Sequence, residues 1–177
     1  MTNEGCILEV VLRVREVESA DAAAVAQIHV QARSAYYAAA GVDQDDREAV
    51  SYGERATMWE HFVAEPKATV LGADDDGTLV GFIAWASTPK ASEVATGAIE
   101  LLALYVRPNC WGQRIGGQLY ELFAEHLAAQ TVGRGVLDVW NRNERALGFY
   151  RRRGWRGRGT IRPGPLGAPF VTLQLAL

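Results

Sequence analysis

The pattern of hydrophobic and polar positions predicts six β-strands. Residues 8–15 and 171–177 alternate between the two classes, which is the period of two expected of half-buried strands. Residues 68–73, 78–86, 99–106 and 135–140 are mostly apolar runs of strand length. The second and third of these six strands are joined by residues 74–77, which end in Asp-Gly and predict a β-hairpin.

Four stretches between these strands have helical character. The first runs from a predicted N-cap at Ser19 to about Arg33, with Val25, Ile28 and Ala32 on one face. The others are residues 51–64, 113–130 and 141–152; the last is predicted to begin with a capping box of Asn141 and Glu144. The order of elements predicts one α/β domain over residues 1–177, built around a mixed sheet.

The composition is that of an ordinary globular protein. Of 177 residues, 49% are hydrophobic and 22% are charged, which excludes a disordered chain. No apolar run approaches the ~20 residues that a membrane-spanning helix needs, and the first residues lack a signal-peptide pattern. We therefore expect a soluble, cytoplasmic protein. The two cysteines and three histidines are scattered, so no metal site is predicted.

Charge is distributed unevenly along the chain. Residues 1–106 carry 7 Lys+Arg against 17 Asp+Glu, whereas residues 107–177 carry 11 Arg against 4 Asp+Glu. The basic C-terminal part favours a polyanionic ligand, either a phosphorylated cofactor or a nucleic acid. A solvated, arginine-rich surface is the alternative.

Three glycines, Gly112, Gly116 and Gly117, lie where the strand at 99–106 gives way to a helix. The first N–H groups of a helix are unpaired and carry partial positive charge, and small residues let a phosphate approach them. Arg114 can add a charged contact or point into solvent. The spacing fits neither the Walker pattern of nucleotide triphosphatases nor the dinucleotide-binding pattern.

Two motifs in this region carry a family resemblance. Residues 100–106 (ELLALYV) with 111–116 (WGQRIG) resemble the central motif of the GNAT acetyltransferase superfamily, an apolar strand followed by [QR]-x-x-G-x-[GA]. Residues 143–150 (NERALGFY), closing with Gly154-Trp155, resemble the family's N-x-x-A-x-x-[LF]-Y…G-[FW]. The chain departs from the first motif at Trp111, in place of Gln or Arg, and at Arg114, in place of glycine.

The resemblance implies a mixed, mostly antiparallel sheet of six to seven strands flanked by helices, and transfer of acetyl from acetyl-CoA directly to a primary amine. It implies that the strand at 99–106 splays away from the strand at 135–140 and that the coenzyme arm enters the gap. The implied contacts are Leu104, Tyr105, Val106 and Asn143 for the arm, and Gly112, Gln113, Arg114, Ile115, Gly116 and Gly117 for the pyrophosphate.

Two residues are catalytic candidates. Glu100 is proposed as general base, directly or through a water, because family members often carry a glutamate there; a structural salt bridge is the alternative. Its even offset from Val106 predicts that both side chains share a face of the sheet. Tyr150 suits protonation of the leaving thiolate by residue type and motif position. Its alternative is a core aromatic beside Phe149.

The sequence gives little indication of which residues form the acceptor pocket. Family resemblance places it near the first helices, so we consider Arg33, Tyr36, Tyr37, Trp59 and Trp85, for all of which packing is the competing explanation. Neither nucleic acid nor membrane is an expected partner, and a homodimer is the family-based expectation. Two other functions stay open: a catalytically inactive acyl-CoA-binding regulatory domain, and a nucleic-acid-binding module using the basic tract 151–156.

Overall fold

Seven strands form one mixed sheet in the computed structural model, which describes residues 12–42, 52–87, 98–131 and 133–176. The strand order is β1-β2-β3-β4-β5-β7-β6, and every neighbouring pair is antiparallel except β4 and β5. The strands are β1 (Arg13–Glu16), β2 (Ala68–Asp75), β3 (Thr78–Ala86), β4 (Ile99–Val106), β5 (Arg134–Trp140), β6 (Arg156–Arg162) and β7 (Phe170–Ala176).

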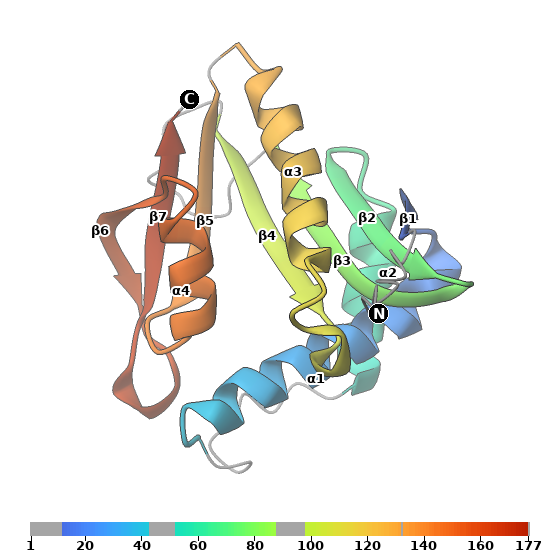
Figure 1. Ribbon diagram of the computed structural model, residues 1–177, viewed down its shortest axis with the longest axis horizontal. Coiled ribbons are helices and arrows are strands. Elements are labelled where there is room, and N and C mark those ends of the chain that lie inside the picture. Colours follow the sequence, from blue (N-terminus) through green and yellow to red (C-terminus); the bar gives the residue numbers. More distant parts are fainter. Residues whose placement is uncertain (1–11, 43–51, 88–97, 132, 177) are drawn as a thin grey trace, which may run out of the picture.

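Helices cover both faces of this sheet (Figure 1). They are α1 (Ala22–Ala39), α2 (Tyr52–Val63), α3 (Ile115–Ala128) and α4 (Glu144–Arg151). One core packs α3 and α4 against one face, and a second core packs α1 and α2 against the other. No helix in the described ranges is both long and apolar enough to span a membrane.

Both predicted helix caps are wrong. Residues Ser19–Asp21 form a separate 3-10 turn, in which the Asp21 carboxylate accepts from the Glu18 N–H at 3.0 Å, and α1 begins after it at Ala22. In α4, Asn143 rather than Asn141 is the N-cap. Its side-chain oxygen accepts from the Ala146 N–H at 3.1 Å, three residues on, as an N-cap does.

The six predicted strands are confirmed, although residues 8–11 of the first lie outside the described residues. Strand β6 was not predicted, because its sequence, RGRGTIR, has almost no apolar residues. It lies at the edge of the sheet and pairs only with β7 among the described strands. Its residues of described burial are all exposed, so its pairing with β7 rather than an apolar face holds it in the sheet.

The sheet divides between β4 and β5. In the described chain the two strands pair through Ile99–Gly135 and Glu100–Val136 alone, and they diverge beyond those residues (Figure 1). At the far end, α1 bridges the two halves. Tyr37 near the end of α1 is fully buried and packs edge-on against Trp140 of β5, with ring centroids 5.0 Å apart. The fold therefore holds the strands apart between two fixed ends.

A β-bulge at Leu102 changes which face Glu100 occupies. Ala103 pairs with Ala84 but Leu101 pairs with Trp85, so β4 holds one extra residue there. Leu101 accordingly packs with the α3 core, whereas Ala103 and Tyr105 pack with the α1 core. The expected shared face of Glu100 and Val106 is thus wrong. The bulge puts Glu100 on the α1 face and leaves Val106 on the α3 face.

Candidate active site

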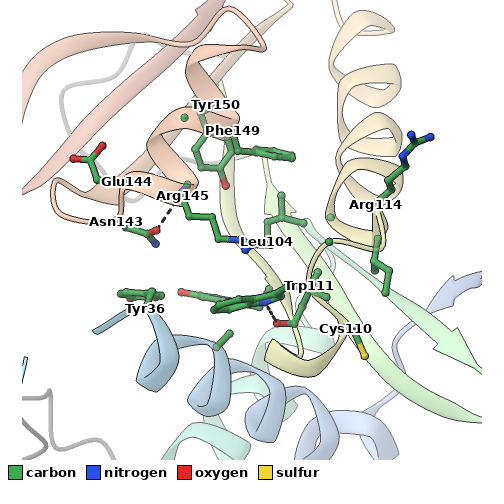
Figure 2. Close-up of a pocket in the computed structure, with 18 of the residues that line it drawn as sticks. Tyr36, Leu104, Cys110, Trp111, Arg114, Asn143, Glu144, Arg145, Phe149 and Tyr150 are labelled. Atoms are coloured by element: carbon green, nitrogen blue, oxygen red, sulfur yellow. Dashed lines mark hydrogen bonds between the residues drawn. The ribbon is translucent and has the colours of Figure 1, made fainter. Parts of the chain in front are cut away.

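A cavity of about 520 Å³ opens where β4 and β5 separate. Its walls come from four parts of the chain: the end of β4 (Leu104–Val106), the loop into α3 with the first residues of that helix (Cys110–Gly116), α4 with its two caps (Asn143–Arg152), and two residues of α1, Ala32 and Tyr36. Figure 2 shows Arg145 and Tyr150 from α4 on one side, and Leu104 and Trp111 facing them. The volume lies in the range of small-molecule and cofactor sites.

The edge of β4 presents backbone groups to this cavity. The Arg107 N–H donates to Val80 O in β3 at 2.8 Å, and alternate residues of an antiparallel strand direct their backbone groups to opposite sides. The backbone of Tyr105 is therefore directed to β3, while those of Leu104 and Val106 are directed to the gap. The Val106 carbonyl confirms this direction, because it accepts from the Trp111 indole N–H at 2.8 Å.

The side chain of Tyr105 leaves the gap for the α1 face. It stacks on His29, with ring centroids 4.5 Å apart, and burial raises the pKa of its hydroxyl. Burial, with the charges of Arg55 and Arg33, lowers the pKa of His29 to about 2. His29 also accepts from the Trp59 indole N–H at 3.0 Å. A neutral histidine and a packed Trp59 belong to the core rather than to a site.

The loop between β4 and α3, called the cradle loop below, turns sharply before the helix begins. Gly112 has a φ of 87°, and Arg114 has a φ of 63° immediately before α3 begins at Ile115. These left-handed conformations turn the chain so that the first N–H groups of α3 lie at the cavity, whose lining includes Gly116. A helix start of this kind attracts anions.

Arg114 shows why the family motif has glycine at its position. Left-handed backbone carries a steric cost for any residue with a Cβ, and Arg114 keeps the glycine-like conformation nonetheless. Its side chain is exposed and lies beside α3, away from Arg145 and Trp111 (Figure 2). The backbone of Arg114, rather than its guanidinium, faces the cavity.

Tyr150 lies at the cavity wall and is 8% exposed as a residue. It packs edge-on against Phe149 and Trp155, and burial raises the pKa of its hydroxyl. The hydroxyl is therefore protonated at neutral pH. Glu100 is half-buried at the start of β4, opposite Ala86 and Val136, and does not line the cavity.

The structure brings most of the expected coenzyme residues together. Eight of the ten line the cavity, namely Leu104, Tyr105, Val106, Gly112, Arg114, Ile115, Gly116 and Asn143, whereas Gln113 and Gly117 lie outside it. Of the acceptor candidates, Tyr36 lines it. Tyr37 is buried and its hydroxyl accepts from Arg33 at 2.8 Å, while Trp85 faces Phe123 on the α3 side.

Several lining residues were not identified from the sequence: Trp111, Arg145 and Arg152 among them, with Ala32 from α1. The first three stand at variable or adjacent positions of the two motifs, so their place in the chain was a usable signal. Nothing in the local pattern distinguishes Ala32 from the other alanines of α1, because its role depends on how α1 crosses under the sheet.

Comparison with known proteins identifies the family. The model of the acetyltransferase (GNAT) family matches residues 28–155, which is most of the chain. The chain belongs to the GNAT family. This family assignment agrees with the separated strands and with the glycine-bearing helix start described above.

Solved structures share the GNAT fold. The PaiA N-acetyltransferase of Thermoplasma acidophilum, in complex with coenzyme A, is 22% identical, with a TM-score of 0.69 over 94% of this chain and 99% of that one. YncA of Salmonella typhimurium, with its cofactor acetyl-CoA, is 17% identical, with a TM-score of 0.65 over 94% of both chains. The ribosomal-protein-alanine N-acetyltransferase of Brucella melitensis is 21% identical, with a TM-score of 0.68 over 94% and 100%.

The search of curated proteins gave no significant match.

Replacing Arg114 with glycine tests the backbone of the cradle. We expect Arg114→Gly to raise the free energy of unfolding by about 1 kcal/mol, because it relieves the left-handed strain of a residue with a Cβ. Urea unfolding with an unchanged m-value measures this difference. Gln113→Gly is the control in the same exposed loop, where φ is not positive, and it should not stabilise the protein. Equal effects of the two changes would contradict the account.

Proposed function

We propose that this GNAT-family protein transfers acetyl from acetyl-CoA directly to a primary amine of a small molecule or peptide. The observation that carries the proposal is the division of the sheet, which exposes the backbone of Leu104 and Val106 beside the α3 helix start. The pantetheine arm is an extended chain with two amides. It can therefore pair with the β4 edge as an added strand does.

The cavity also suits the charged part of the coenzyme. The start of α3 supplies N–H groups and the positive end of the helix dipole for the pyrophosphate. Arg145 and Arg152 from α4 line the same cavity, and Glu144 is its one acidic lining residue in the described chain. Anionic phosphates are therefore favoured at the part of the cavity between the start of α3 and α4, and the uncharged pantetheine arm is favoured along β4.

The reaction requires a neutral amine. An amine of pKa ~10.4 is about 0.04% neutral at pH 7, so removing its proton costs a free energy of roughly 4–5 kcal/mol. In the proposed step the amine nitrogen attacks the acetyl carbon, the carbon–sulfur bond breaks, and the amine loses one proton while the leaving sulfur gains one. A base is needed to accept the proton of the amine, and an acid is needed to protonate the leaving sulfur. The oxygen of the attacked acetyl group gains negative charge, and the Val106 N–H, which is directed to the gap, is the proposed hydrogen-bond donor to it.

Glu100 is the proposed base. It shares the α1 face of β4 with Tyr105, on the side from which Ala32 and Tyr36 line the cavity. Since Glu100 itself does not line the cavity, the proton passes to it through a water. Tyr150 is the proposed acid, because its protonated hydroxyl lies at the cavity wall and can donate to the leaving sulfur.

Two measurements on the wild-type protein test the activity. Acetyl-CoA at 100 times its Kd should stabilise the folded state by about 2.7 kcal/mol, seen as a raised Tm. Release of free thiol from acetyl-CoA with a panel of primary amines should exceed the rate without amine. Stabilisation without thiol release would favour the inactive acyl-CoA-binding domain, and absence of both would overturn the proposal.

Replacing Glu100 with glutamine tests the base. We expect Glu100→Gln to lower kcat/KM by about 10²–10³-fold, with the largest loss at low pH, where less of the amine is already neutral. Coenzyme affinity should stay within about twofold of wild type. Glu121→Gln, an exposed glutamate on α3, is the control for the loss of one charge. A pH–rate profile identical to that of wild type would reject the assignment.

Replacing Tyr150 with phenylalanine tests the acid. The change keeps the packing against Phe149 and Trp155 and removes the hydroxyl alone. We expect kcat to fall by about 10²-fold while KM for acetyl-CoA changes little. Tyr120→Phe is the control, since Tyr120 is buried outside the cavity lining; its hydroxyl accepts from the Trp155 indole N–H at 2.8 Å, so this change should lower the Tm and leave kcat unchanged. Full activity of Tyr150→Phe would leave Tyr150 as a packing residue.

A further inference from the structure

Arg145 and Trp111 meet across the cavity. The guanidinium carbon of Arg145 lies 4.3 Å from the centroid of the Trp111 ring, within the range of a cation–π contact. Arg145 comes from the first turn of α4 and Trp111 from the loop before α3, so the contact joins two walls (Figure 2). The indole is itself held, because its N–H donates to the Val106 carbonyl at 2.8 Å.

This contact leaves the hydrogen-bonding capacity of Arg145 unused. A guanidinium stacked on a ring keeps its N–H donors at its edge, where they can bind an oxyanion in a bidentate manner. Arg145 is exposed at the cavity lining, and no hydrogen bond or ion pair of its side chain is found within the described residues. Its donors therefore remain available to a ligand.

The position of Arg145 in α4 is unfavourable for the helix alone. It is the second residue of α4, next to the positive end of the helix dipole, where acidic residues stabilise and cations do not. Glu144 occupies the favourable place beside it. An exposed cation at a helix start that rests on an aromatic ring and lines a cavity is suited to bind an anionic ligand.

Trp111 is an uncharged side chain at the first position of the motif in the cradle loop. At this position the family motif has Gln or Arg, and the side chain of Arg114 lies away from the cavity. A cation from α4, Arg145, lies over this position. The Trp111 ring provides the surface on which it rests, next to the Gly112–Gly116 turn.

We propose that Arg145 binds the pyrophosphate of the coenzyme and that Trp111 is the positioning residue that holds Arg145 over the cradle. The proposal rests on coenzyme binding as stated under the proposed function. It assigns the charged contact to α4 rather than to the side chain of Arg114. Because the pyrophosphate and the 3′-phosphate share their chemistry, the experiment has to separate them.

The test measures the Kd of three ligands by calorimetry: coenzyme A, dephospho-coenzyme A, which lacks the 3′-phosphate, and pantetheine, which has no phosphate. We expect Arg145→Ala to weaken coenzyme A and dephospho-coenzyme A equally, by about ten- to fiftyfold, as for hydrogen bonds to charged groups. Pantetheine should bind as it does to wild type. Arg145→Lys should recover part of the loss, because a lysine keeps the charge without the bidentate geometry.

Substitutions of Trp111 test the positioning role. Trp111→Leu should weaken both phosphate-bearing ligands by about three- to fivefold, and Trp111→Phe, which keeps an aromatic face, by less. In the Arg145→Ala background the same Trp111→Leu change should have little further effect, because the residues act through one contact. Additive losses would contradict the positioning role.

Arg151→Ala is the matched control. Arg151 is an exposed arginine at the other end of α4 that lines a different groove, so its loss changes the net charge equally without touching this cavity. Equal weakening of pantetheine and coenzyme A by Arg145→Ala would indicate a general structural role and overturn the inference, as would an unchanged Kd. A loss confined to coenzyme A would reassign Arg145 to the 3′-phosphate. If the wild-type protein binds none of the three ligands, the proposed function itself fails.

Discussion

The arrangement of the site depends on one constraint: β4 and β5 are neighbours in the sheet, but they pair over only two residues of each strand in the described chain. Neighbouring strands in a sheet ordinarily satisfy each other's backbone groups, and unpaired groups away from water are costly. Here the described pairing stops after Glu100–Val136. The backbone of Leu104 and Val106 is left facing a cavity, and one of those groups, the Val106 carbonyl, is satisfied by the Trp111 indole. The rest of the edge is open to an extended ligand.

The two halves of the sheet stay apart because each end of the gap is fixed. At one end the Ile99–Gly135 pair closes the sheet beneath the packed rings of Phe123 and Trp155. At the other, α1 passes under the gap and buries Tyr37 against Trp140. The bulge at Leu102 sets the faces of the strand beside the gap: Glu100 and Tyr105 lie on the α1 face, whereas Leu104 lies on the α3 face. Glu100 and Leu104 thus lie on opposite faces of one strand.

Much of this arrangement was predictable from the sequence, for physical reasons that differ between elements. Strand β4 was predicted with its observed bounds because an apolar run ended by proline has few alternatives. The cradle loop was predicted from the glycines at the junction of a strand and a helix. The separation of β4 from β5 was expected only because the sequence resembles the family. The face of Glu100 was mispredicted, since a bulge depends on the register with β3 and leaves no mark in the pattern of β4. The Arg145–Trp111 contact was missed because it joins distant segments and exists only once α4 packs beside the loop.

The central claim is that the coenzyme arm pairs with the open edge of β4, and amide hydrogen exchange at single residues tests it most directly. Acetyl-CoA should slow exchange at the Leu104 and Val106 amides, whose N–H groups are directed to the gap. It should change the Tyr105 and Arg107 amides far less, because the register already directs these groups to β3, where the Arg107 N–H donates to Val80. Equal slowing at all four amides, or none at Leu104 and Val106 when the ligand is bound, would contradict the account.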